Sequence, residues 1–264
     1  MCETDGVMTG TRWRAAILSM LLAAAPFTGV LATGQQPAQP AAQADAIPAN
    51  EVLNYQIEWR LIPAGTAKLT WAESNLKVHI ESTGLVSRLY HVDDEYGAAL
   101  TKNLCVQSSF LTAHEGSRNR DTRVNYDQQT KKAKYVEKDL IKNTTTVHEM
   151  DVPPCVHDVI GGLMVLRTLH LEPGNTAQIP ISDGKKFVQV KVESQRREEI
   201  STATGTKKTI RYEVFLFDNV LFKRSGHLHV WLTDDNLRLP VQLQVRLQFT
   251  IGTITLKLDK EEKS

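Results

Sequence analysis

The chain has 264 residues and a formal net charge of +1, because 31 lysine and arginine residues almost balance 30 aspartate and glutamate residues. Nucleic-acid-binding domains usually carry a basic face or stripe, so this composition argues against a nucleic-acid partner. The charged clusters at 117–123 and 194–199 are of mixed sign, which is typical of solvated loops or strand edges. The length fits one domain or a two-lobed one, because mostly β domains reach roughly 200 to 250 residues.

The amino-terminal segment has the pattern of an export signal. Arg12 and Arg14 supply positive charge, an apolar run follows at 15–27, and small residues suited to cleavage come next. The apolar run is shorter than the roughly 20 residues that a membrane-spanning helix needs. The sequence therefore predicts a signal peptide at 1–32, with an uncleaved anchor as the alternative. The protein is expected to be soluble after cleavage, in the periplasm or otherwise exported, without a membrane span.

Composition divides the remainder of the chain. Residues 33–50 are rich in Gln, Ala and Pro and contain no aromatic residue, which predicts a disordered spacer. A single β-rich domain is expected at 51–259. A charged tail is expected at 260–264.

Apolar and polar residues alternate in several segments of this domain, as they do in strands with one buried face. In the segment 55–61, Tyr55, Ile57 and Trp59 fall on one side. Short turn signals separate it from the next two segments, which predicts a meander of antiparallel strands. Further strands are expected at 67–71, 76–81, 187–193, 210–217, 226–232, 240–249 and 251–258.

Two segments have helical character. The segment 158–171 begins at Asp158, a candidate N-cap, and carries apolar residues mostly on one side. Gly161 and Gly162 within it indicate tight packing or a bend, because glycine weakens a helix. The shorter segment 84–92 predicts a turn of helix across the end of the sheet. Both segments are expected to cover the apolar face of the strands.

These elements predict a mainly β fold: a curved antiparallel sheet, an incomplete barrel or a sandwich, with one substantial helix and a short helical turn packed on it. The strand at 240–249 has a long apolar stripe, formed by Val241, Leu243, Val245, Leu247 and Phe249. Exposure of such an apolar face to water is unfavourable, so other groups must pack against it. The stripe either packs in the protein's own core or lines a cavity for an apolar ligand.

Two cysteines, Cys105 and Cys155, follow the predicted leader. An oxidising compartment would allow them to form a disulfide, and two separate buried thiols are the alternative. A bridge that closes this loop would stabilise the fold by about 4 kcal/mol on the loop-entropy model.

Four segments carry a resemblance to a known family. They cover most of the chain after the spacer: NYQIEWRLIPAGTAKLTW, STGLVSRLYHVDDEY, HDVIGGLMVLRTLHLEPG and GHLHVWLTDDNLRLPVQLQVRLQFTIGTITLKL. In these segments the chain resembles domain-of-unknown-function family 3108, a family of exported bacterial envelope proteins. The resemblance implies a β-rich protein of Gram-negative-type envelopes. It transfers no catalytic residue.

One pair of side chains has a spacing that some metal sites use. His227 and His229 lie two residues apart on an expected strand, so their side chains point the same way. The sequence places no third ligand beside them, and two solvent-facing histidines are the alternative interpretation. The aspartates at 93–94 and 234–235 fit turns more simply than cation sites. No catalytic or phosphate-binding motif is present, so no catalytic residue or cofactor is assigned.

The leading hypothesis is a non-enzymatic binding or envelope-maintenance protein for a lipid-like or amphipathic ligand. The candidate binding residues are aromatic or apolar groups on the early strands and the short helical turn, namely Trp59, Trp71, Leu85, Leu89 and Tyr90. One alternative is a metal-dependent envelope enzyme that uses the two histidines. The other is a scaffold that binds an envelope protein through a sheet edge.

Overall fold

A computed structural model of the chain describes residues 47–247 and 252–263, all of which belong to one compact unit. The predicted leader at 1–32, most of the predicted spacer and Phe249 of the apolar stripe lie outside the described residues. Neither helix in the described part of the chain has the length and apolar character needed to cross a lipid bilayer.

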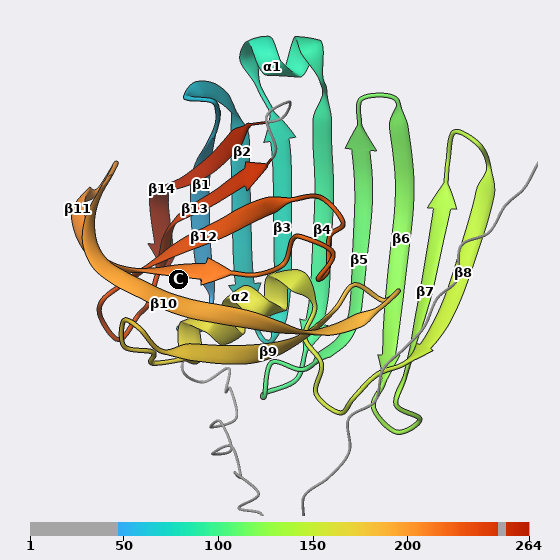
Figure 1. The fold of residues 1–264 in the computed structure, drawn as a ribbon. Helices are drawn as coiled ribbons and strands as arrows, with labels where there is room; N and C mark the ends of the chain where they lie inside the picture. Colours follow the sequence, from blue (N-terminus) through green and yellow to red (C-terminus); the bar gives the residue numbers. More distant parts are fainter. Residues whose placement is uncertain (1–46, 248–251, 264) are drawn as a thin grey trace, which may run out of the picture. The chain divides into compact units, whose positions relative to one another are not determined.

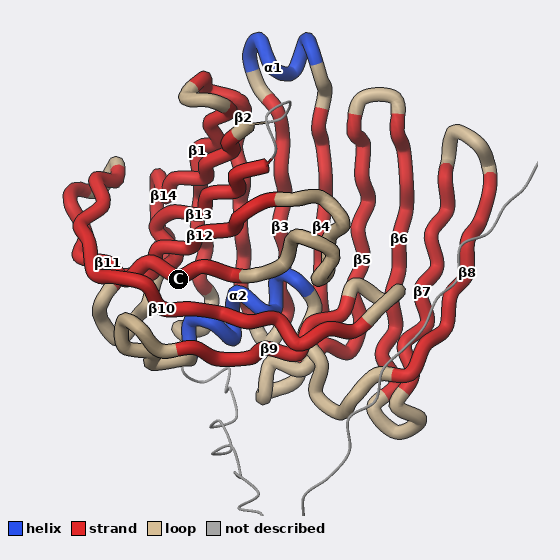
Figure 2. Tube along the Cα trace, viewed as in Figure 1, coloured by secondary structure: helices blue, strands red, loops and turns tan. Residues whose placement is uncertain are grey.

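The described residues form fourteen strands and two short helices (Figures 1 and 2). The helices are α1 (Gly84–Leu89) and α2 (Val159–Thr168). The strands are β1 (Glu51–Trp59), β2 (Ile62–Ala72), β3 (Asn75–Ser82), β4 (Val92–Leu100), β5 (Val106–Glu115), β6 (Arg118–Asp127), β7 (Lys132–Asp139), β8 (Thr144–Asp151), β9 (Thr176–Ser182), β10 (Phe187–Thr202), β11 (Gly205–Val214), β12 (Gly226–Thr233), β13 (Pro240–Leu247) and β14 (Thr253–Lys263).

All fourteen strands belong to one antiparallel sheet that is not closed into a barrel. Its order is β8-β7-β6-β5-β4-β3-β2-β1-β14-β13-β12-β11-β10-β9. The chain lays down β1 to β8 in one direction, passes through α2, and returns from β9 to β14 on the other side of β1. Figure 1 shows the sheet turning so that β9–β12 run across the first strands. The prediction of a mainly β protein with a curved antiparallel sheet is confirmed.

The alternation predicted from the sequence places apolar side chains on the inner face of the sheet. On β1 and β2, Leu53, Tyr55, Leu69 and Trp71 are all buried. The apolar stripe of β13 begins in the same core with Val241, whereas the next apolar positions of that strand are only partly buried. The stripe therefore belongs to the protein's own core at one end and to a more open part of the inner face beyond it.

The structure contains six strands that the sequence pattern did not predict, β4 to β9. The charged cluster at 117–123 lies mostly within β6, and the cluster at 194–199 lies within β10, so neither is a loop. Strand β8 is exposed on both faces and has no alternation to detect. Cross-strand pairing explains these strands, because charged residues are tolerated on the face of a sheet that remains in water.

The carboxyl end also differs from the prediction. Strand β14 continues to Lys263, and its residues 260–263 pair with β1 in a register that sets Glu51 opposite Lys263. The predicted charged tail is therefore wrong over these residues. Alternating side chains let a charged strand pair through its backbone while its charges stay in water.

Helix α2 confirms the longer of the two helix predictions. Asp158 is its N-cap and accepts hydrogen bonds from the backbone N–H groups of Ile160 and Gly161. A methyl group on Gly161 would lie 2.5 Å from Oδ1 of Asp158, and one on Gly162 would lie 2.7 Å from Cδ1 of Ile181. Of the two roles considered for the glycines, close packing is therefore the correct one.

Helix α1 occupies the predicted position but has no buried residue. The expectation that it covers the apolar face is wrong. It forms the connection between β3 and β4 and extends beyond the end of the sheet (Figure 1).

A buried ion pair joins α2 to the start of the sheet. Arg167 of α2 and Glu51 of β1 are 3% and 0% exposed. The guanidinium donates to both carboxylate oxygens of Glu51, at 2.5 and 2.9 Å. It also donates to the backbone carbonyls of Leu237 and Arg238, at 3.2 and 3.1 Å. These bonds satisfy both charges inside the protein and fix α2 against β1 and the β12–β13 connection.

Replacing Arg167 with Met is expected to lower the free energy of unfolding by about 3 to 5 kcal/mol, because the Glu51 carboxylate would remain buried without its partner. Urea denaturation measures this change. The matched control is the replacement of Arg197 with Met, because Arg197 is an exposed arginine that pairs with Glu172 and Asp234. This control should lower the free energy of unfolding by less than about 1 kcal/mol. The double replacement Glu51→Leu with Arg167→Met is expected to recover most of the loss. An Arg167→Met variant as stable as the wild type would contradict this account.

Candidate functional site

A cavity of about 400 Å³ lies against the inner face of β3 to β7, beside the amino end of α2. This volume is in the range of pockets that hold small organic molecules. The turn between β9 and β10 and the loop after β11 also contribute to its wall. Its apolar lining includes Val78, Ile80, Leu111, Val124, Val159, Ile160 and Phe222, and its polar lining includes Asp94, Tyr96, Arg120, Tyr126, Tyr135, Glu137, Asp158, Asp183 and Lys185.

Strand register brings these residues together from distant parts of the sequence. Val78 of β3 is opposite Tyr96 of β4, which is opposite Leu111 of β5. Leu111 is opposite Thr122 of β6, which is opposite Glu137 of β7. Paired residues on neighbouring strands project to the same face, so this row crosses the cavity wall from its apolar to its polar side.

Asp158 is the most deeply buried acid of the cavity, with 3% of its surface exposed. Its Oδ2 accepts hydrogen bonds from the N–H groups of Ile160 and Gly161, at 3.0 and 3.2 Å, and from the Tyr96 hydroxyl. Its Oδ1 is buried and has no hydrogen-bond partner among the residues that the structure describes. Burial raises the pKa of Asp158. The site therefore holds a buried carboxyl oxygen whose hydrogen-bonding capacity the described residues leave unused.

Three tyrosines give the cavity wall hydroxyl groups. The Tyr126 hydroxyl donates to the backbone carbonyl of Ser182 at 3.3 Å, and the Tyr135 hydroxyl donates to Glu137 at 2.5 Å. Burial raises the pKa of Tyr96, Tyr126 and Tyr135, so all three remain neutral at physiological pH. The wall therefore offers uncharged hydrogen-bonding groups between apolar side chains.

An arginine lies at the charged side of the cavity. Nη2 of Arg120 is 2.9 Å from Glu115, and Nη1 is 3.9 Å from Glu137. Its buried Nε has no hydrogen-bond partner in the described part of the chain. The ammonium of Lys185 lies 4.3 Å from the centre of the Tyr135 ring. Charges of both signs line this side, so it selects no single ligand charge.

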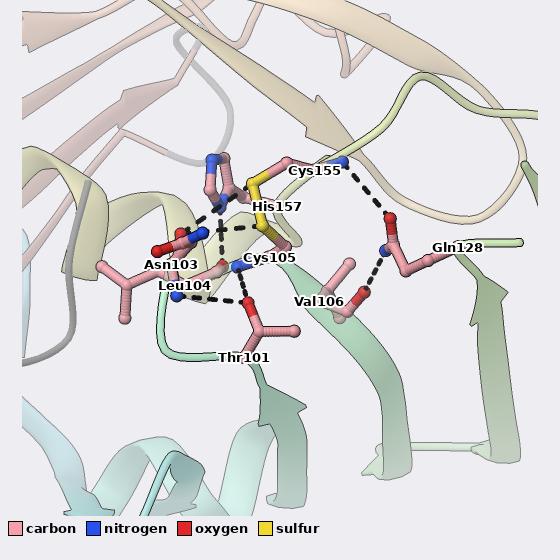
Figure 3. The surroundings of a disulfide bond; sticks show 8 residues. All are labelled: Thr101, Asn103, Leu104, Cys105, Val106, Gln128, Cys155 and His157. Carbon is pink, nitrogen blue, oxygen red and sulfur yellow. Dashed lines mark hydrogen bonds between the residues drawn. A yellow bond between two sulfur atoms is a disulfide. The ribbon is translucent and has the colours of Figure 1, made fainter. Parts of the chain in front are cut away.

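The segment that leads into Asp158 is held by a disulfide between Cys105 and Cys155 (Figure 3). Of the two alternatives for these cysteines, the bridge is confirmed. The backbone N–H of Cys155 donates to the side chain of Gln128 at 3.3 Å, and Gln128 donates in turn to the Val106 carbonyl at 3.2 Å. The bridge therefore joins the segment before α2 to the start of β5.

His157 completes this attachment. Its Nδ1 lies 2.7 Å from the Leu104 carbonyl (Figure 3), and burial lowers the pKa of its imidazole. A neutral ring with its proton on Nδ1 can donate this bond. Its backbone pairs with β9 through Pro180 and Ser182. The residue before Asp158 is thus fixed to both halves of the sheet.

The five predicted binding residues are not among the residues that line this cavity. Trp71 is buried in the core, whereas Leu85, Leu89 and Tyr90 are exposed on α1 and its carboxyl end. Trp59 is partly buried at the end of β1, where the Arg60 guanidinium lies 5.5 Å from the centre of its ring. The structure does not bring these five residues together at one site.

The two histidines lie beside a carboxylate on the neighbouring strand. Nδ1 of His227 is 2.8 Å from Glu213, and Nε2 of His229 is 3.9 Å from it. Burial lowers the pKa of His229. The residues that the structure describes contain no group of three or more metal-ligating side chains. The arrangement places one carboxylate of β11 beside two imidazoles of β12.

Sequence reasoning identified Asp158 only as a helix cap and did not identify the tyrosines of the cavity. Tyr96, Tyr126 and Tyr135 occur in strands that the pattern did not predict. A usable signal was the cap itself, because Gly161, three residues later, leaves room for its carboxylate.

Comparison with known proteins places the chain in a family and identifies one similar fold. A family model described as "Protein of unknown function (DUF3108)" matches residues 54–259. A β-barrel-like protein of the domain of unknown function DUF1849 from Brucella abortus is similar in structure, with a TM-score of 0.52 and 8% sequence identity, over 82% of this chain and 98% of that chain. A protein with a YmcC-like fold from Bacteroides fragilis has a TM-score of 0.32 and 11% identity, over 85% of this chain and 100% of that chain. None of the curated proteins with which the chain was compared matches it.

The raised pKa of Asp158 predicts a distinct pH dependence of stability. A carboxyl whose pKa is higher in the folded than in the unfolded protein binds more protons when folded, so its contribution to stability decreases as pH rises above the unfolded value of about 3.9. The unfolding free energy of the wild type minus that of Asp158→Asn should therefore decrease as pH rises from this value through the folded pKa. Urea denaturation at a series of pH values measures it. An increase with pH would show that the folded pKa is lowered instead.

Removing the disulfide by the double replacement Cys105→Ala with Cys155→Ala is expected to lower the free energy of unfolding by about 4 kcal/mol, because the bridge closes a loop of 50 residues. Thermal and urea unfolding measure the loss. Hydrogen exchange of the backbone should also accelerate at 152–158 more than at the distant β13. Equal acceleration at both places would contradict a local role of the bridge in fixing Asp158.

Proposed function

Because the chain belongs to the DUF3108 family, whose function is unknown, we propose its function from the geometry of the cavity. The protein is a non-enzymatic binding protein that holds a small amphipathic molecule against the inner face of β3 to β7. The observation that carries this proposal is the cavity of about 400 Å³ with apolar walls and the buried, partly unsatisfied carboxyl of Asp158.

The apolar part of the ligand would lie against side chains that the core does not use. Leu111 is only partly buried on the inner face of β5, and Phe222 is 38% exposed at the cavity edge. Burying a leucine or phenylalanine side chain completely contributes roughly 1.5 to 3 kcal/mol. A hydrocarbon chain or ring in the cavity would supply that burial.

The polar part of the ligand would be a hydrogen-bond donor such as a hydroxyl, amide or ammonium group. A buried polar atom without a partner costs about 1 to 3 kcal/mol, which a donor at Oδ1 of Asp158 would offset. The hydroxyls of Tyr96 and Tyr126 are already engaged with Asp158 and Ser182, so they orient the wall rather than compete for the ligand.

Export to the periplasm is part of the proposal. The predicted leader at 1–32 supports it, and so does the disulfide, because disulfides persist in oxidising compartments outside the cytoplasm. The ligand would then be a molecule of the cell envelope, and the role would be to carry, sense or sequester it.

A scaffold function remains the second candidate, on the strength of strand β8. This strand lies at one end of the described sheet and pairs there only with β7, and most of its residues are exposed. An added strand from another protein could extend the sheet at this edge. This candidate requires no ligand in the cavity.

The binding test uses N-phenylnaphthylamine, an apolar fluorescent probe with one N–H donor. Its fluorescence should rise with the purified protein, and Leu111→Arg should weaken its binding at least about tenfold by placing a charge on the apolar wall. Leu89→Arg is the matched control, because Leu89 is exposed and outside the cavity. If both variants bind the probe as the wild type does, the cavity is not its site. If only Leu89→Arg loses binding, the helical turn predicted from the sequence is the site instead.

A further inference from the structure

In the described part of the chain, most of the exposed large hydrophobic side chains lie in connections at one end of the sheet. In a meander of antiparallel strands, alternate connections lie at the same end. The connections β1–β2, β3–β4, β5–β6 and β7–β8 therefore share one end, as Figure 1 shows at the top of the view. We call this end the apolar rim and define it as residues 60–61, 83–91, 116–117 and 140–143.

The rim holds most of the large hydrophobic residues that are exposed in the described part of the chain. Leu61 is 84% exposed, Leu89 is 71% exposed and Ile141 is 67% exposed, and Leu85, Tyr90 and Leu140 accompany them. The connections at the opposite end, residues 73–74, 101–105 and 128–131, hold none, because Leu104 there is buried. The asymmetry between the two ends shows that the exposure is not a general property of the turns.

Packing within the described fold does not explain these residues. Helix α1 places Leu85 and Leu89 beyond the end of the sheet and buries no residue of its own. Exposed apolar groups that gather in one region mark a surface for a protein or a membrane. The charges of the rim distinguish between these two partners.

The charged residues of the rim are basic. It contains Arg60, Arg88 and Lys142, and its sequence has no aspartate or glutamate. The ammonium of Lys142 lies 3.6 Å from Asp139 at the end of β7, so part of its charge is compensated. The connections at the opposite end carry an acid, Glu73, as well as lysines. Apolar side chains beside basic ones fit an anionic lipid surface, where the first enter the acyl region and the second remain at the head groups.

We propose that the apolar rim docks on the surface of a lipid bilayer that contains anionic lipids. Leu61, Leu85, Leu89 and Ile141 enter the outer acyl region, and Arg88 and Lys142 contact the lipid phosphates. The contact is peripheral, because the rim consists of connections and one helix of six residues. The proposal goes beyond the binding function and does not depend on a ligand in the cavity.

The test is hydrogen exchange of the full chain with vesicles of phosphatidylcholine and phosphatidylglycerol. Backbone amides at 83–91 and 140–143 should exchange more slowly with these vesicles, and amides at 73–74 and 128–131 should not change. Because the measurement resolves position, contact of the amino-terminal segment with the vesicle would not produce this pattern. Unchanged exchange at both rim segments would overturn the proposal. Equal protection by phosphatidylcholine alone would overturn the choice of an anionic surface.

Matched variants separate the apolar and the charged contributions. The double replacement Leu85→Ser with Leu89→Ser should lower vesicle affinity at least about tenfold, whereas Val147→Ser, at an exposed valine of β8 outside the rim, should leave it unchanged. Arg88→Glu should lower the affinity about fivefold or more, and Lys131→Glu at the opposite end should have no effect. Wild-type affinity of the double serine variant, or equal losses in the rim variants and their controls, would contradict docking through the rim.

Discussion

The attachment of the segment before α2 is the constraint on which the rest of the structure depends. The chain builds β1 to β8 in one direction and must return to place β9 to β14 on the other side of β1. The disulfide from Cys155 to Cys105, the bond from His157 to the Leu104 carbonyl and the pairing of His157 with β9 fix the point of return. Both halves of the sheet meet at this segment, and α2 begins immediately after it. The ion pair between Arg167 and Glu51 then fixes the other end of α2 to the first strand.

The same attachment creates the cavity. Fixing His157 places Asp158 at the amino end of α2, where its carboxylate caps the helix and faces the residues of β4. Burial of this acid is unfavourable for its charged form, and its hydrogen bonds engage only one of its two oxygens. The surrounding structure holds this group in place, and a buried acid with a raised pKa beside a cavity is a candidate for a binding site. The proposed binding function and the fold therefore depend on the same few residues.

Sequence patterns predicted the parts of this fold in which local chemistry is decisive. The strong alternation of β1 to β3 and β10 to β14 reflects one buried face, and the cap of α2 predicted its start. The glycines of α2 indicated close packing or a bend, and the structure shows close packing. The resemblance to family 3108 is confirmed by the family model. Strands such as β8, which is exposed on both faces, leave no alternation, and their existence depends on pairing with a neighbour. Pairing is a long-range property that one sequence does not display.

The candidate site was less predictable for the same reason. Its wall is a row of residues from five strands, and the row exists only once the register aligns Val78, Tyr96 and Leu111. The choice of Trp59, Trp71 and the apolar residues of 84–92 rested on residue type, which does not distinguish a core position from an exposed turn. Trp71 is buried in the core, and Leu89 is exposed at the rim. The cysteines illustrate the limit most clearly, since their spacing allowed a bridge or two thiols and only the geometry shows the bridge.

The most direct test of the central claim is native mass spectrometry of the full chain purified after export by the cell that makes it, followed by solvent extraction. The account predicts a complex with one small amphipathic molecule, and it predicts that Leu111→Arg removes this molecule while Leu89→Arg retains it. A mass without any bound molecule, from protein whose disulfide and folded state are intact, would contradict the account. That result would mean that the residues of the cavity wall serve the core and not a ligand. It would favour a protein partner at the edge of β8 instead.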